Sequence, residues 1–235
     1  MNLTAATPRS PKNGWLLLFY CPLAVLIPSF ILLHTWGWGG HLNWIADPIS
    51  VYTSSAPGRT FGTACMISLG AIYLILAIGM SGKLPHTLPG SLSILSLGIA
   101  GALLFFVARY PAPVKPAPNA PYKTLWQVIK EKIAGAPPKP EEQVRQEEVA
   151  KAHGDMILSS TVCLIVSQTA LIIALWRDPR QAWLARCTLI LLPVLAVLFI
   201  GAFTSASYQG LHQRAAFILV LGWLLLLAKR FLRTA

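Results

Sequence analysis

Long apolar runs alternate with short polar segments along most of the chain. Six of these runs come close to or reach the roughly 20 residues that an α-helix needs to cross a membrane. They cover residues 14–36, 60–80, 88–109, 155–176, 185–203 and 213–232. Pro22, Pro28 and Pro193 fall inside these runs, where neighbouring helices of a membrane bundle can accommodate them. The fifth run is the shortest of the six. The pattern predicts an all-α polytopic membrane protein, a bundle of six transmembrane helices.

The longest polar segment, residues 110–152, separates the third and fourth apolar runs. It begins with the proline-rich stretch YPAPVKPAPNAP, which is typical of an extended chain. Residues 122–135 then carry apolar side chains at helical spacing, namely Leu125, Val128, Ile129 and Ile133. This spacing predicts a short amphipathic helix on the membrane surface or on the bundle. Pro140, Glu141 and Glu142 are typical of a helix start, and we expect that helix to run into the fourth span.

Lysine and arginine residues predict the orientation of the bundle, because cytoplasmic segments carry an excess of them. With the amino terminus inside, the inner segments contain Arg9, Lys12, Lys83, Arg177, Arg180, Arg186, Lys229, Arg230 and Arg233. The short outer loops contain Arg59 and Arg214. We therefore expect a multi-pass protein of the bacterial inner membrane with both termini in the cytoplasm and residues 110–152 as a periplasmic loop. Residues 1–13 would form a cytoplasmic segment, and residues 14–235 would form one transmembrane domain.

Composition supports the membrane assignment. The 235 residues are 55% hydrophobic and 11% charged, whereas soluble domains carry about 25% charged residues. The mean hydropathy is +0.60. The net charge of +11 therefore does not indicate a nucleic-acid partner. In a membrane protein, basic residues mark orientation and contacts with lipid headgroups, so membrane lipids are the expected partners.

Six polar residues with binding chemistry lie at the outer ends of the predicted helices: Asp47, Ser50, His153, Asp155, His212 and Arg214. Arg214 adjoins an apolar run, and an unpaired charge at low dielectric is costly, so we expect it to pair with Asp155 or else with Asp47. The preferred interpretation is a structural clamp between two helices, or an arginine that reaches the headgroups. The alternative is a polar cavity for a lipid headgroup or another anion, with Arg214 as its anchor.

The sequence gives little support for a metal site or a haem site. His34, His153, Asp155 and His212 are suitable metal ligands, but they lack the spacing of known zinc motifs. The histidines lie at helix ends, which disfavours haem ligation inside a bundle. The four cysteines fall inside apolar runs without metal-ligand spacing. We predict no metal and no cofactor, although a bound lipid is compatible with the pattern.

Four short motifs occur in a recognisable order. DPISVY follows the first helix, FFVARYP ends the third, AHGD opens the fourth and GLHQRAAFILVLGW opens the sixth. Together they resemble the bacterial six-helix membrane family catalogued as domain of unknown function 998. The corresponding family positions here are Ser50, Pro111, His153, Gly210 and Arg214. The resemblance implies a six-helix fold and topology, and it implies no activity.

Three functional hypotheses follow. The leading hypothesis is a non-catalytic integral membrane protein, either an accessory subunit of a larger membrane complex or a lipid-binding module. The alternative is a membrane-embedded enzyme that acts on lipid at the outer leaflet, with His153 as general base, Asp155 as its orienting group and Arg214 as phosphate anchor. In the third, the helix at 122–135 or a transmembrane face docks a protein partner.

Overall fold

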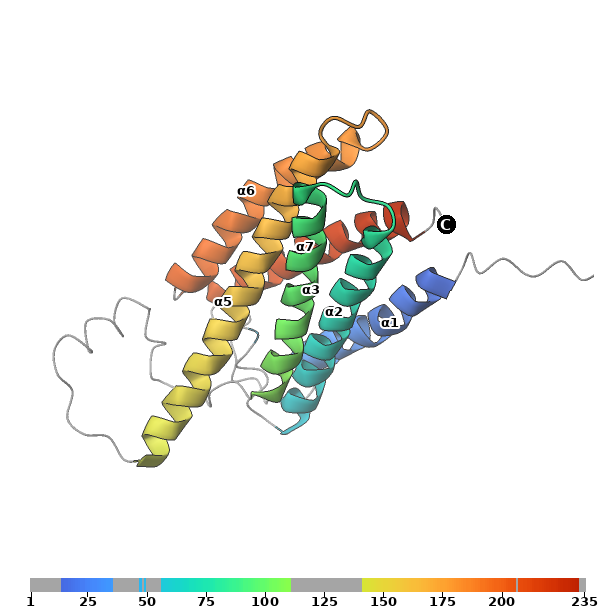
Figure 1. The fold of residues 1–235 in the computed structure, drawn as a ribbon. Coiled ribbons are helices and arrows are strands. Elements are labelled where there is room, and N and C mark those ends of the chain that lie inside the picture. Colours follow the sequence, from blue (N-terminus) through green and yellow to red (C-terminus); the bar gives the residue numbers. More distant parts are fainter. Residues whose placement is uncertain are drawn as a thin grey trace, which may run out of the picture.

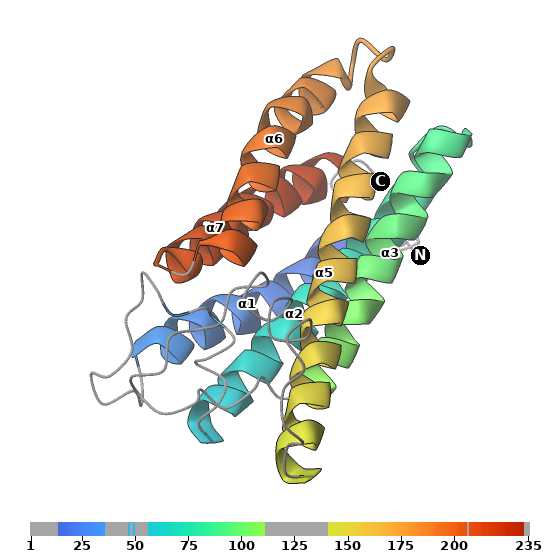
Figure 2. The same ribbon diagram turned by 90° about the vertical axis from the view of Figure 1, so that its left-hand side faces the viewer.

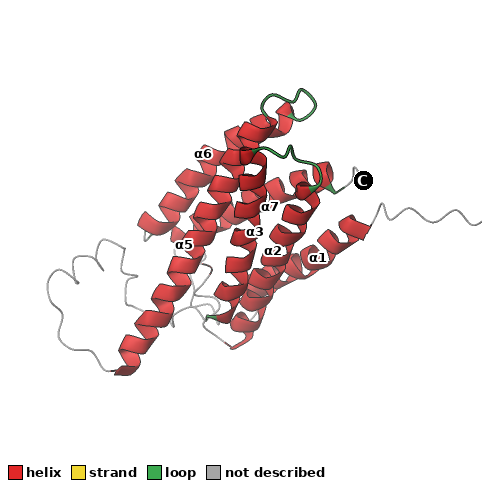
Figure 3. Ribbon diagram, in the orientation of Figure 1, coloured by secondary structure: helices red, strands yellow, loops and turns green. Residues whose placement is uncertain are grey.

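The computed structural model describes residues 14–35, 47, 49, 56–110, 141–205 and 207–232, and all of its regular structure is helical (Figures 1 and 3). The helices are α1 (Gly14–Thr35), α2 (Ala56–Ser81), α3 (Leu88–Arg109), α5 (Glu141–Leu175), α6 (Ala182–Thr204) and α7 (Gln209–Phe231). In this part of the chain, six helices are long and apolar enough to cross a membrane. The predicted six-helix architecture is therefore confirmed. The loop helix expected at 122–135 lies outside the described residues.

Several helices extend a few residues beyond their apolar runs, and α5 differs most. Helix α5 has 35 residues and begins at Glu141, so the helix expected after Pro140 does run into the fourth span. The connection from α3 is accordingly shorter than 110–152. Helix α6 has 23 residues, one more than α1 or α3, although its apolar run is the shortest of the six. Pro193 lies inside this helix without ending it.

The helices form a ring in chain order. Each packs against the next, and α7 returns to contact α2. The rings of Phe30 on α1 and Phe217 on α7 stack with centroids 4.4 Å apart, which joins the first and last helices. Figure 2 shows α5 standing between α3 on one side and α6 with α7 on the other. Helices α1, α3 and α6 end at one end of the bundle, where α2 and α7 begin. We call this the cavity end, because residues near it line a cavity between the helices.

Helices α2 and α3 approach closely at two glycines. A Cβ atom built on Gly101 would lie 2.8 Å from the carbonyl oxygen of Gly70 and 3.0 Å from the Cβ of Tyr73. A Cβ on Gly70 would likewise lie 2.8 Å from the Gly101 oxygen. Small residues let membrane helices pack at short range, where van der Waals contact replaces the hydrophobic drive that exists in water.

Buried hydroxyl groups link other helix pairs. Ser167 on α5 donates to the Ser93 carbonyl oxygen of α3 at 2.9 Å. Trp223 on α7 is 1% exposed, and its indole nitrogen donates to the Thr188 hydroxyl of α6 at 3.1 Å. In an apolar medium such groups need partners, because an unpaired polar group there costs free energy. These bonds therefore specify which helix faces meet.

The short turn between α5 and α6 lies at the opposite end of the bundle from the cavity end. The Asp178 carboxylate accepts hydrogen bonds from the Gln181 amide at 2.7 Å and from the Arg180 backbone nitrogen at 2.9 Å. These bonds favour the ionised form, and they hold the pKa of Asp178 below its usual range. The turn thus closes on itself and brings α6 back against α5.

The glycine contact gives a matched pair of variants on α3. Gly101→Ala should force α2 and α3 apart and reduce the free energy of unfolding by about 1–3 kcal/mol, the usual effect of overpacking. Gly98→Ala is the control, because its added Cβ would meet only the Ala77 Cβ at 3.9 Å. Thermal or denaturant unfolding in detergent micelles measures both. Equal stability of the two variants would contradict the close approach at Gly101.

Candidate functional site

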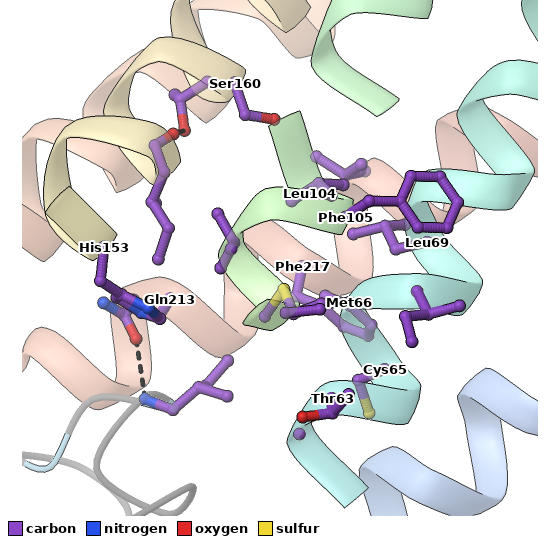
Figure 4. Close-up of a pocket in the computed structure, with 18 of the residues that line it drawn as sticks. Thr63, Cys65, Met66, Leu69, Leu104, Phe105, His153, Ser160, Gln213 and Phe217 are labelled. Carbon is purple, nitrogen blue, oxygen red and sulfur yellow. Dashed lines mark hydrogen bonds between the residues drawn. The ribbon is translucent and has the colours of Figure 1, made fainter. Parts of the chain in front are cut away.

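The cavity lies between the helices and has a volume of about 670 Å³ (Figure 4). All six described helices contribute residues to its wall. The wall is mainly apolar and includes Cys65, Met66 and Leu69 of α2, Leu104 of α3, and Phe217 of α7. Figure 4 shows His153 and Gln213 on one side of the pocket and Leu69 and Phe105 on the other. Pockets of this volume typically enclose most of the surface of one small ligand.

Arg59 and Arg109 line the cavity at the start of α2 and the end of α3, and we call this part of the cavity its mouth. Arg59 stands in the first turn of α2, and Arg109 is the last residue of α3; both line the cavity and both are exposed. Within the described chain neither makes a hydrogen bond or an ion pair. Tyr110, which caps the end of α3, lines the mouth beside them. The mouth thus combines positive charge with an aromatic side chain above an apolar interior.

His153 lines the same cavity from α5. It is 8% exposed, and its Nδ1 lies 3.0 Å from the main-chain oxygen of Tyr110. Its Nε2 is buried and has no hydrogen-bond partner among the residues that the structure describes. The imidazole therefore joins the end of α3 to α5 through one nitrogen and leaves the other unused.

The first turns of α7 hold the segment that follows α1. The Gln213 side-chain oxygen accepts from the backbone nitrogen of Ile49 at 2.8 Å, drawn as the dashed line in Figure 4. Arg214 is 8% exposed, and its Nη1 donates to the main-chain oxygen of Asp47 at 3.1 Å. Gln213 and Ile49 both line the cavity. The two adjacent α7 side chains thus hold Asp47 and Ile49 by their main-chain atoms.

The predicted ion pair between Arg214 and Asp155 is not formed among the described residues, and that prediction is wrong. Asp155 is exposed, whereas His153 and Arg214 are buried. Residues two positions apart lie on different faces of a helix, so His153 and Asp155 cannot both point inward. Arg214 instead donates to the carbonyl oxygen of Asp47, the alternative partner, which lies between α1 and α2, so a clamp between two helices stays a prediction.

The other expected site residues take separate positions. His34 donates from Nδ1 to the main-chain oxygen of Phe30 at 2.6 Å, and its ring packs at a tilt on the Phe30 ring. His212 packs its ring against Gly201 of α6, where an added Cβ would come within 2.8 Å, and it is not among the cavity-lining residues. Ser50 lies outside the described residues. The described members of the predicted cluster therefore make separate small contacts, and among them His153 alone lines the cavity.

Sequence reasoning did not single out Gln213 or the pair of arginines at the mouth. Gln213 shares a helix face with Phe217 and Val220, four and seven positions later, and all three line the cavity. The spacing of Gln213, Phe217 and Val220 therefore predicts that Gln213 lies on the inward face of α7. Arg59 and Arg109 lie at adjacent helix ends in an antiparallel pair, which also indicates proximity.

Two wall side chains with catalytic potential, Ser160 and His153, make hydrogen bonds that join helices. In the described part of the chain, no three His, Cys, Asp or Glu side chains gather where a metal ion would fit. The Ser160 hydroxyl lines the cavity but donates to the main-chain oxygen of Ala100 at 3.1 Å, so it is engaged in joining α5 to α3. His153 makes no hydrogen bond to a described hydroxyl or thiol group.

Comparison with protein-family models gives one match. The family described as "Protein of unknown function (DUF998)" matches residues 22–230, which is most of the chain. The matched region includes four complete helices, all of α7 except its last residue, and most of α1. Neither the curated proteins nor the solved structures contain a significant match.

The clamp interpretation predicts different outcomes for two substitutions. Arg214→Ala should lower the free energy of unfolding by about 1–3 kcal/mol, because it leaves the buried Asp47 carbonyl without this donor. Asp155→Asn should change it by less than about 0.5 kcal/mol, as expected for an exposed site without partners. Unfolding in micelles measures both. If Asp155→Asn lowered the free energy of unfolding as much as Arg214→Ala, the result would support an ion pair between Arg214 and Asp155.

Proposed function

We propose that this chain, which belongs to the DUF998 family, is a non-catalytic membrane protein that binds one anionic amphiphile. The observation that carries the proposal is the cavity of about 670 Å³, apolar inside and bordered by two guanidinium groups at its mouth. An amphiphile would place its hydrocarbon chain in the interior and its charged group at Arg59 and Arg109.

The interior favours a hydrocarbon chain. Removal of apolar surface from water stabilises a complex by roughly 25 cal/mol for each Å² buried, and the wall offers mainly apolar side chains. Ile67 and Phe105 line the cavity and are 43% and 37% exposed, so this part of the wall offers accessible apolar surface to a hydrocarbon chain.

The mouth favours an anionic headgroup. Arginine offers several N–H donors in a planar fork that matches a phosphate or carboxylate. Neither Arg59 nor Arg109 makes a hydrogen bond or an ion pair to another described residue, so both are available to a ligand. In the predicted orientation the mouth lies at the outer leaflet of the bacterial inner membrane.

Binding is favoured over the enzymatic alternative by the placement of its proposed residues. Asp155 is exposed and makes no hydrogen bond to His153, so it does not orient the imidazole; the Tyr110 carbonyl occupies that position. Arg214 is occupied by Asp47. The partner surface expected at 122–135 lies outside the described residues, and the role of an accessory subunit stays a prediction.

Removal of the two mouth charges should weaken anion binding. The double variant Arg59→Gln/Arg109→Gln should bind a single-chain alkyl phosphate roughly 2- to 30-fold more weakly, since each exposed charge pair contributes about 0.2–1 kcal/mol. Binding of the alkyltrimethylammonium of equal chain length should not weaken. Titration of the purified protein in a neutral detergent, followed by native mass spectrometry, measures both affinities.

The matched control is Arg177→Gln/Arg180→Gln, which removes two exposed arginines from the turn at the opposite end of the bundle. It should bind the alkyl phosphate as the unmodified protein does. If both double variants lost the same affinity for the alkyl phosphate, the effect would come from the net charge of the protein and not from Arg59 and Arg109 in particular. Absence of saturable binding of any single-chain amphiphile to the unmodified protein would refute the proposed function.

A further inference from the structure

His153 raises a question that the proposed anionic site leaves open. Its ring is 8% exposed and lines the cavity, yet its Nε2 atom is buried without a hydrogen-bond partner among the described residues. Buried polar side-chain atoms in folded proteins nearly always have partners. A buried acceptor left unsatisfied is also costly. A partner that enters the cavity is therefore the natural source of the missing bond.

The chemistry of that partner follows from the other ring nitrogen. Nδ1 lies 3.0 Å from the main-chain oxygen of Tyr110, and a carbonyl oxygen only accepts hydrogen bonds, so Nδ1 carries the proton. A neutral imidazole has one N–H, which leaves Nε2 as a bare acceptor. No described carboxylate hydrogen-bonds to the ring, so none is placed to hold it in the charged form. Nε2 therefore needs a donor, and an ionised phosphate or carboxylate oxygen does not supply one.

The position of His153 relates this acceptor to the charged mouth. The ring is bonded to Tyr110, the residue after Arg109, so the acceptor lies close to the end of α3 where the anionic group is expected. Gln213, another polar wall residue, is drawn on the same side of the pocket (Figure 4), and its side-chain oxygen already accepts from Ile49. The apolar wall of Leu69 and Leu104 lies across the cavity. A donor group on the ligand would thus lie between its charged group and its hydrocarbon chain.

We propose that the ligand carries a free hydroxyl group next to its anionic group, and that this hydroxyl donates a hydrogen bond to Nε2 of His153. This inference rests on the proposed function and names the class of ligand: a single-chain amphiphile with a phosphate and a neighbouring hydroxyl, as in a lysophospholipid. His153 is a specificity-determining residue in this scheme, since an amphiphile without the hydroxyl would fill the same cavity and leave the acceptor unpaired.

Two ligands that differ by one hydroxyl test the inference. The first is 1-acyl-glycerol 3-phosphate, and the second is its 2-deoxy analogue with the same chain and phosphate. The full-length protein in detergent should bind the first about 3- to 10-fold more tightly, the range expected for one net hydrogen bond. In protein labelled with ¹⁵N-histidine, the Nε2 resonance should start at the position of an unprotonated nitrogen and should move on addition of the first ligand alone.

Variants at position 153 assign the preference to this side chain. His153→Phe should bind the two ligands equally, because it keeps an aromatic ring and has no acceptor. His153→Gln should retain part of the preference, because its amide can donate to Tyr110 and still present an oxygen. His86→Phe is the matched control: His86 is exposed near the start of α3, at the opposite end, and its loss should leave the preference unchanged.

The outcomes separate this inference from the proposed function. Equal binding of the two ligands by the unmodified protein, or an Nε2 that is already protonated, would overturn the hydroxyl assignment while the amphiphile site stands. A preference that survives in His153→Phe would also overturn it. Binding of neither ligand would refute the proposed function itself. If His153→Phe does not fold, the ligand pair and the nitrogen resonance of the unmodified protein still decide the question.

Discussion

The absence of water inside a bilayer is the constraint on which the rest of this structure depends. Backbone amides there have no solvent partners, so each crossing segment must satisfy its hydrogen bonds internally, and the described spans are all helical. Lipid is as apolar as the helix surfaces, so burial alone does not drive these helices together. Close packing at Gly70 and Gly101, and hydrogen bonds such as Trp223 to Thr188, supply the specificity.

The same constraint explains why polar groups gather at one end of the bundle. Arginine, glutamine and histidine side chains are tolerated near helix ends, and here they border the cavity. Gln213 and Arg214 bind main-chain atoms of Ile49 and Asp47, so a structural clamp and part of the cavity wall come from adjacent residues. The first two turns of α7 therefore contribute both to the stability of the fold and to the wall of the proposed binding site. His153 completes the polar side of the cavity from α5.

The errors of sequence reasoning have a common physical origin. Asp155 and Arg214 lie near the starts of the fourth and sixth apolar runs, but a similar depth in the membrane does not determine which way each helix is rotated about its axis. Helical geometry does bear on rotation: Asp155 is two positions from His153, so only one of them can face the interior. The same geometry places Gln213 with the apolar residues that line the cavity. The periodicity of apolar residues within each helix therefore indicates which polar side chains face the cavity.

By itself, the sequence determined six membrane-length helices, their alternating direction and the helical start of α5 at Glu141, because hydropathy and helix-start signals are local properties of the chain. It also indicated which polar residues share one end. Only the tertiary structure decided that Arg214 binds the Asp47 main-chain oxygen, that His153 has one satisfied nitrogen and one unsatisfied, and that a cavity remains between the helices. Every backbone carbonyl is chemically alike, so no sequence pattern marks the one that an arginine will reach. A cavity, in turn, depends on how several helices pack together.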